Sequence, residues 1–172
     1  DSSIIKQPVA PPVTSKPKAG DTDTGNEDAP VSYDRPKGWR DGRMSSMRLA
    51  AFNVGPEDKS AEITVIPAGG DLRGNVARWL GQVRKGTAPE QVVDQALKDA
   101  QDVTVAGVAG KRFLLIGEKS DAADRMAIDA TIIPLGSDGT SSLFVKMTGP
   151  AETVEKQADE IALFLKSLKL NL

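Results

Sequence analysis

The stretch from Gly69 to Val83, GGDLRGNVARWLGQV, constrains the fold most, because it combines a turn, a helix start and a tryptophan. Its two glycines can adopt backbone angles that other residues avoid, and Asp71 is a preferred N-cap whose carboxylate accepts the free amides of a first turn. The stretch therefore predicts a helix that begins near Leu72. Its apolar side chains recur at helical spacing and would face a core: Leu72, Val76, Trp79, Leu80 and Val83.

A second face of this helix carries polar side chains, about a quarter turn from the apolar stripe. Asn75, Arg78 and Gln82 align on that face. Beside the edge of Trp79, these two amides and one guanidinium could hydrogen-bond a protein partner or an anionic ligand. The candidate binding residues are therefore Asn75, Arg78, Trp79 and Gln82, and the alternative interpretation of this row is a solvated helix flank.

Composition excludes most common catalytic chemistries. The 172 residues include no Cys and no His, which excludes disulfides, thiolate nucleophiles, zinc fingers and Ser-His-Asp triads. The 22 basic and 24 acidic residues nearly cancel, so we expect no nucleic-acid partner. No apolar run approaches the roughly 20 residues of a membrane-spanning helix. The sequence therefore predicts a protein that is not an enzyme and that uses no cofactor and no metal.

Residues 1–33 differ in composition from the rest of the chain. They contain five prolines, three lysines and five acidic residues, with no hydrophobic period. Such a segment cannot bury enough apolar surface to offset its ordering entropy, so it predicts a disordered linker or tether. Residues 34–172, with 19 basic and 19 acidic residues remaining of the 22 and 24, would form a single domain without net charge.

The chain begins at Asp1 and not at Met. We expect that an N-terminal segment was removed, by processing or by design of the expressed chain. Loss of a signal peptide or lipoprotein signal would fit the tether. It would place the domain outside the cytoplasm, in the periplasm or tethered to the envelope, with any membrane attachment made through the lost anchor.

Two apolar segments ahead of the first helix predict a β-hairpin. Residues 44–52 and 61–66 read as its strands, joined by a turn-rich segment. Arg48 and Glu62 would then form a cross-strand pair on the surface. Trp39 follows a turn that ends in glycine, and such a tryptophan is expected to close the edge of a core.

The second half of the chain predicts further helices and strands. Thr87 and Glu90 have capping-box spacing, which indicates that a second, shorter helix begins there. Pro150 is expected to start a long amphipathic helix at the C-terminus. Strands are predicted at residues 102–106, 111–119, 126–135 and 142–148. This order suits an antiparallel sheet covered by helices.

Pro36-x-Gly38-Trp39 ahead of an apolar hairpin, Asn75 to Trp79 on a first helix, and the amphipathic C-terminal helix resemble the PsbP/Mog-like family. The resemblance covers about residues 34–170. It implies an α+β fold, in which an antiparallel sheet is covered by helices as an α/β/α sandwich. Family members include photosystem-associated luminal proteins, Ran-binding nuclear proteins and bacterial secreted or lipid-anchored proteins. The last group is the most similar, which implies a non-catalytic accessory or binding domain.

Three functions remain open at this point. The first is an extracytoplasmic accessory or protein-binding module on a flexible tether, monomeric and acting through an unidentified protein partner. The second is a carrier of a small apolar ligand between the sheet and the C-terminal helix. Its lining would come from residues that otherwise read as packed core: Ile128, Ile132, Val145 and Leu165.

The third function is a hydrolase without Cys or His, because paired carboxylates can perform acid/base chemistry alone. Its candidate acids lie near one loop: Asp121, Asp124 and Asp129. The alternative interpretation of these acids is a solvated turn. The first function accounts best for the tail, the missing Cys and His, and the neutral domain.

Overall fold

The computed structural model describes residues 22–23, 29–119, 124–136 and 140–171. Its centre is an antiparallel sheet of seven strands, within the described residues. In the order of the sheet, the strands are β3 (Arg40–Asp41), β4 (Ala50–Val54), β5 (Ala61–Gly69), β9 (Ser141–Pro150), β8 (Met126–Leu135), β7 (Val108–Ile116) and β6 (Gln101–Val105). Every neighbouring pair is antiparallel.

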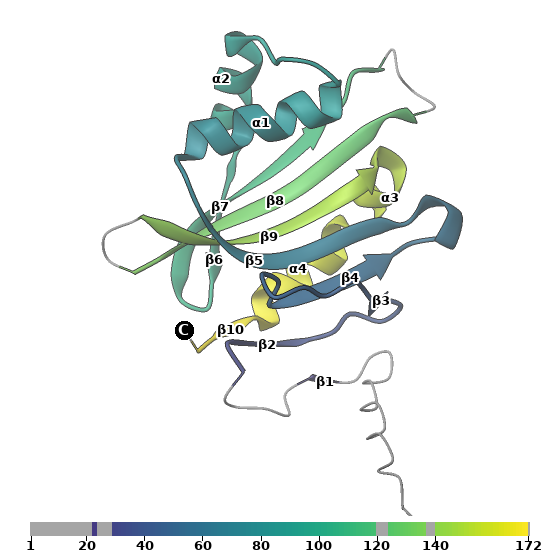
Figure 1. Ribbon diagram of the computed structural model, residues 1–172, viewed down its shortest axis with the longest axis vertical. Coiled ribbons are helices and arrows are strands. Elements are labelled where there is room, and N and C mark those ends of the chain that lie inside the picture. Colours follow the sequence, from purple (N-terminus) through teal and green to yellow (C-terminus); the bar gives the residue numbers. More distant parts are fainter. Residues whose placement is uncertain (1–21, 24–28, 120–123, 137–139, 172) are drawn as a thin grey trace, which may run out of the picture.

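Helices lie on both faces of this sheet (Figure 1). On one face are α1 (Leu72–Arg84) and α2 (Glu90–Asp99), and on the other are α3 (Ala151–Lys156) and α4 (Ala158–Ser167). A short 3-10 helix, η1 (Glu57–Lys59), joins β4 to β5. A second, three-stranded sheet contains β1 (Thr22–Asp23), β2 (Val31–Asp34) and β10 (Lys169–Leu170). The predicted α+β fold, an antiparallel sheet covered by helices, is therefore confirmed.

Helix α1 begins and ends where its local sequence requires. The carboxylate of Asp71 accepts a hydrogen bond from the backbone amide of Gly74 at 2.9 Å, which confirms the predicted N-cap. At the other end, Lys85 takes the left-handed conformation with φ 60° and its amide donates to the carbonyl of Gly81. The helix packs its apolar stripe, including Val76 and Trp79, against the sheet.

Two hydrophobic cores lie on the two faces of the sheet, and alternate residues of β9 enter each of them. Leu143, Val145 and Met147 belong to the core under α3 and α4. Phe144 belongs to the core under α1 and α2, where its ring meets Trp79 edge to face at a centroid distance of 5.4 Å. Strand β9 therefore contributes side chains to both cores.

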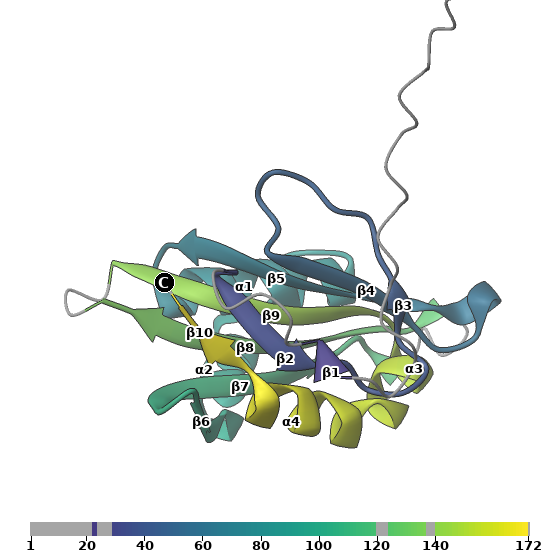
Figure 2. The same ribbon diagram turned by 90° about the horizontal axis from the view of Figure 1, so that it is seen from below.

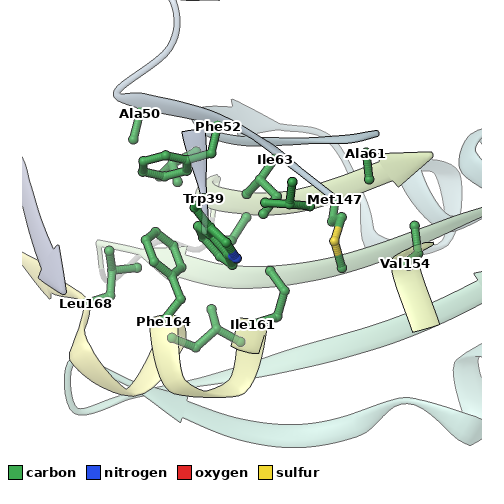
Figure 3. Packing of buried hydrophobic residues seen from close by; sticks show 14 of the residues in the cluster. Trp39, Ala50, Phe52, Ala61, Ile63, Met147, Val154, Ile161, Phe164 and Leu168 are labelled. Atoms are coloured by element: carbon green, nitrogen blue, oxygen red, sulfur yellow. The ribbon is translucent and has the colours of Figure 1, made fainter. Parts of the chain in front are cut away.

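An aromatic cluster anchors the core beneath α4 (Figure 3). The ring of Trp39 lies 5.3 Å from Phe52 and 5.1 Å from Phe164. Its indole Nε1 donates to Oε1 of Gln157 at 3.0 Å, so the polar atom of this buried ring has a partner. Trp39 is 4% exposed, which confirms the prediction that it closes a core.

The folded domain includes residues 31–33, which the sequence assigned to the linker. Val31 is buried and Tyr33 packs against Phe52 and Phe164, with centroid distances of 5.5 and 5.2 Å. Strand β2 pairs with β10 at the other end of the chain. Three residues are too few to show a hydrophobic period, and their partner lies far away in sequence. Residues 1–21 and 24–28 lie outside the described residues, so the linker itself stays a prediction.

Two details of the predicted helices differ from the structure. Helix α2 begins at Glu90 with Pro89 at its N-cap and no capping side chain, so the predicted capping box of Thr87 and Glu90 is wrong. Proline 89 is extended, with ψ 152°, and this delays the helix start beyond the reach of Thr87. The C-terminal helix is divided at Gln157, whose side chain accepts a hydrogen bond from the indole of Trp39.

Candidate functional site

One part of the sheet has no helix over it on the α1 side. Helices α1 and α2 lie over β7 and β8, so the same face of β4, β5 and the middle of β9 is uncovered by helices (Figure 1). The loop between β3 and β4 rises beside this region, on the side of the sheet away from α4 (Figure 2). A strand face of this kind normally displays polar side chains to water.

Lys146 lies in the middle of this region. It belongs to β9 and is paired with Thr64 of β5 and Ala130 of β8. Because Val145 and Met147 point into the core under α4, Lys146 points to the opposite face, beside α1. It is half-buried, and its Nζ lies 5.6 Å from the centre of the Trp79 ring, within range of a cation–π interaction.

The charge of Lys146 is held in an unfavourable environment. Burial lowers the pKa of Lys146 below its ordinary value, and the neighbouring guanidinium of Arg78 lowers that pKa further. The Glu62 carboxylate opposes this decrease in pKa, while Arg48 contributes to it. Among the described residues, no carboxylate lies within ion-pair distance of its Nζ. Lys146 is therefore a partly desolvated cation without a bonded counter-ion.

Arg78 is a second cation next to Lys146. Its side chain is exposed, and its Cζ lies 5.8 Å from the centre of the same Trp79 ring. No ion pair joins Arg78 to an acid in the part of the chain that the structure describes. Its guanidinium is thus free to receive a carboxylate or phosphate in a bidentate manner.

Arg48 completes this group of cations. Its Nη1 donates to the Glu62 carboxylate at 3.0 Å and to the backbone carbonyl of Arg43 at 2.7 Å. The predicted pair of Arg48 and Glu62 is therefore confirmed, although Arg48 lies just before β4 and not within a strand. We call Arg48, Arg78 and Lys146 the basic face. It joins three cations to one acid, in a domain whose 19 basic and 19 acidic residues cancel overall.

The structure divides the four residues predicted as a binding row. Arg78 and Gln82 are exposed and line a shallow hollow of about 490 Å³ between α1 and the segment that leads to α2. Asn75 is 5% exposed, and Trp79 is fully buried beneath Lys146. The prediction of one accessible row is therefore wrong for Asn75 and Trp79. Binding by Arg78 and Gln82 stays a prediction.

The side chains of Asn75 and Trp79 are buried within the fold. Nδ2 of Asn75 donates to the carbonyls of Gly69 and Asp71, at 3.3 and 3.1 Å, and so ties the turn to the first turn of α1. The indole Nε1 of Trp79 is buried and has no hydrogen-bond acceptor among the described atoms. The helical spacing placed Trp79 on the apolar stripe correctly, but the ring packs against Phe144 and Lys146 of β9, so the edge that was expected to be free is buried.

The predicted lining of an apolar carrier pocket is wrong. Ile128 and Ile132 lie in the core under α1 and α2, whereas Val145 and Leu165 lie in the core on the other face. The sheet separates the two pairs, so they cannot surround one ligand. Strand alternation decides this arrangement. Residues that pair across β8 and β9 share a face of the sheet, and a residue one position away from such a pair points to the opposite face.

The acids predicted for a hydrolase are also separated. Asp121 lies outside the described residues. Asp124 is exposed and lines a hollow of about 900 Å³ beside α3, in which four basic and four acidic side chains balance. Asp129 is buried elsewhere, where it accepts hydrogen bonds from Nε and Nη2 of Arg112 at 3.0 and 2.8 Å. Asp124 and Asp129 therefore do not share a site, and no metal-binding group of acids occurs among the described residues.

Sequence reasoning missed Lys146. The residue stands between Val145 and Met147, and it was assigned no role from the sequence. A usable signal was present, because helices were predicted on both sides of the sheet. A charged residue in the centre of such a strand must either be paired or lie on an uncovered region.

No protein-family model and no curated protein sequence matches this chain. Among solved structures, it is similar to LpqN of Mycobacterium tuberculosis, which is described as involved in cell envelope biogenesis, with a TM-score of 0.52 and 11% sequence identity. The match covers 86% of this chain and 87% of LpqN. The two proteins share a fold. A structure from Bacteroides thetaiotaomicron has a TM-score of 0.49 and 13% identity over 89% of this chain and 49% of its own.

The likeness to LpqN supports the α+β fold and does not single out the PsbP/Mog-like family. Separately, the part of the chain that the structure describes contains no helix with the length and apolar character needed to cross a membrane.

Proposed function

We propose that this chain is a non-catalytic accessory module that binds an acidic segment of a protein partner through the basic face. The observation that carries the proposal is Lys146, a half-buried cation without a bonded counter-ion and with Arg78 beside it. A partly desolvated charge destabilises the folded protein unless something offsets it. A carboxylate bound between Lys146 and Arg78 would do so, and perturbed pKa values are typical of binding sites.

The geometry favours an extended acidic peptide over nucleic acid. The basic face has only three cations, and Glu62 neutralises part of their charge. Nucleic acid is normally held by many phosphate contacts, and single strands also stack on exposed aromatic rings. Here the nearest ring, that of Trp79, is buried. Two or three carboxylates on one short segment match the number of available cations.

We further propose that the module acts outside the cytoplasm, as a monomer on a flexible tether, and belongs with the bacterial secreted or lipid-anchored PsbP/Mog-like proteins. The similar structure of LpqN, a protein described as involved in cell envelope biogenesis, supports this setting. The proline-rich composition of residues 1–33 supports the tether. The absence of Cys and His, and the pairing of Asp129 with Arg112, support a role without catalysis.

The proposal is tested by affinity capture from an envelope extract with three forms of the full chain. These are the wild type, the double variant Arg78→Gln/Lys146→Met, and the control Lys98→Gln/Lys166→Met, whose two exposed lysines lie on α2 and α4. We expect a protein that binds the wild type and the control but not the double variant. Moderate salt and a glutamate-rich peptide should both release it, because screening weakens exposed ion pairs.

Equal capture by the wild type and the double variant would contradict the proposal. So would a partner that resists both salt and the glutamate-rich peptide, because its binding would not depend on carboxylates at the basic face.

A further inference from the structure

A second hollow lies at the N-terminal end of α1, away from the basic face. Its volume is about 490 Å³, which is within the usual range for small-molecule sites. It is formed between the first turn of α1, the starts of β7 and β9, and the end of β8. Its apolar lining includes Leu72, Ala109, Ile132 and Pro134. Leu72 is 38% exposed, although it belongs to the apolar stripe of α1.

Asn75 supplies a fixed polar group to this hollow. Its Nδ2 is bonded to the carbonyls of Gly69 and Asp71, which fixes the orientation of the side-chain amide. The Oδ1 atom therefore cannot exchange places with the nitrogen without losing both bonds. Within the described residues, Oδ1 accepts no hydrogen bond and is not enclosed. Asn75 is 5% exposed and lines the hollow, so its side chain offers one acceptor of fixed orientation there.

The charged groups around the hollow are mainly negative. Asp71 uses one carboxylate oxygen to cap α1 and keeps the other unbound. Asp102 is paired with Lys111 across β6 and β7, so this pair has no net charge. A ligand with an anionic head would place its oxygens against Asn75 Oδ1 and the Asp71 carboxylate. Both contacts would be repulsive.

We propose that this hollow binds a small amphiphile with an apolar body and a hydrogen-bond donor head, an alcohol or a primary amine. The apolar body packs on Leu72, Ile132 and Pro134. The donor head bonds to Oδ1 of Asn75. The same geometry disfavours a carboxylate head, which has no proton to donate at neutral pH. This site is independent of the basic face, and its test does not depend on the proposed function.

The first test compares head groups on one apolar body and uses the unmodified chain. Backbone amide NMR spectra are recorded during titration with 1-hexanol, hexylammonium and hexanoate. We expect 1-hexanol and hexylammonium to shift the signals of Leu72, Asn75 and Ala109. Hexanoate should bind at least about tenfold more weakly, the factor that corresponds to one lost hydrogen bond with an oriented partner.

A second test fills the hollow. Ala109 is exposed on the side of β7 that lines it, so Ala109→Trp should occupy the space and abolish the shifts caused by 1-hexanol. Leu114→Trp is the matched control, because Leu114 is 49% exposed on the opposite face of the same strand. This control should bind like the wild type.

Three results would overturn the proposal. They are equal binding of hexanoate and 1-hexanol, ligand-induced shifts that lie away from the hollow or do not occur, and unchanged binding by Ala109→Trp.

Discussion

The buried ion pair of Arg112 and Asp129 predicts a large and asymmetric loss of stability on mutation. The pair joins β7 to β8, and Nη2 of Arg112 also donates to the carbonyl of Ala158 at the start of α4, at 3.0 Å. Removing either partner leaves the other as an unpaired charge. The cost should therefore depend on how deeply the remaining residue is buried.

The exposure of the two side chains sets the expected magnitudes. The Asp129 side chain is 3% exposed and that of Arg112 is 13% exposed. Asp129→Ala leaves an arginine that keeps its bond to Ala158 and some contact with water, so we expect a loss of about 3 kcal/mol. Arg112→Met leaves the more deeply buried carboxylate, and we expect a loss of about 4 to 5 kcal/mol. The double variant leaves no charge and should lose only about 1 to 2 kcal/mol, for the small cavity and the bond to Ala158.

Urea unfolding followed by circular dichroism measures these three values, with the denaturant slope as a check that the compactness of each state is unchanged. A double variant less stable than both single variants would refute the reasoning. A loss below about 1 kcal/mol for Asp129→Ala would do the same, because the pair would then behave like an exposed one.

Three further variants have expected outcomes. Lys146→Met should raise stability by up to about 1 kcal/mol near neutral pH, because it removes a partly desolvated charge. Since the pKa of Lys146 is lower in the folded state than its ordinary value of 10.5, the wild type should gain stability as pH rises from the folded pKa toward the unfolded one. The variant should lack that gain. Urea unfolding at several alkaline pH values measures it, and a gain of stability that persists in the variant would contradict the prediction. Asp71→Ala should lose about 1 kcal/mol, because the amide of Gly74 loses its cap, and an unchanged urea midpoint would contradict this. Gly149→Ala should lose about 1 to 3 kcal/mol by overpacking, because its Cβ would lie 2.6 Å from the Cβ of Ala61. A thermal midpoint equal to that of the wild type would show that β5 and β9 separate more easily than this contact suggests.

The parts of the fold that depend on local interactions were predictable from the sequence. The start of α1 follows from Asp71, whose cap involves a residue three positions later. The turn between β6 and β7 has Ala106 and Gly107 at φ 52° and 81°, and it falls between the strands predicted at residues 102–106 and 111–119. Alternation alone also assigned Val145 correctly to the core.

The parts that depend on distant contacts were not predictable in the same way. Tyr33 joins the domain through Phe164, which lies at the other end of the chain. The division of the last helix at Gln157 accompanies a bond to Trp39, which is 118 positions away. A helical pattern contains no information about either contact.

For the candidate site, the sequence predicted the local positions of Arg78 and Arg48 but not that of Lys146. Helical spacing identified Arg78 as a polar flank residue, and strand pairing identified Arg48 with Glu62. The position of Lys146 beside Arg78 requires knowledge of which strands α1 covers, and the sheet order decides that. The sequence therefore indicated separate charges, and only the packing of α1 on the sheet brings them together.

The most direct test of the basic face is an NMR titration of the lysine Cε signals with a glutamate-rich peptide, at low and at high salt. The account predicts that the Lys146 signal shifts, that high salt removes the shift, and that the pKa of Lys146 rises toward its ordinary value when the peptide is bound. A peptide that shifts other lysines and leaves the signal and pKa of Lys146 unchanged would contradict the account.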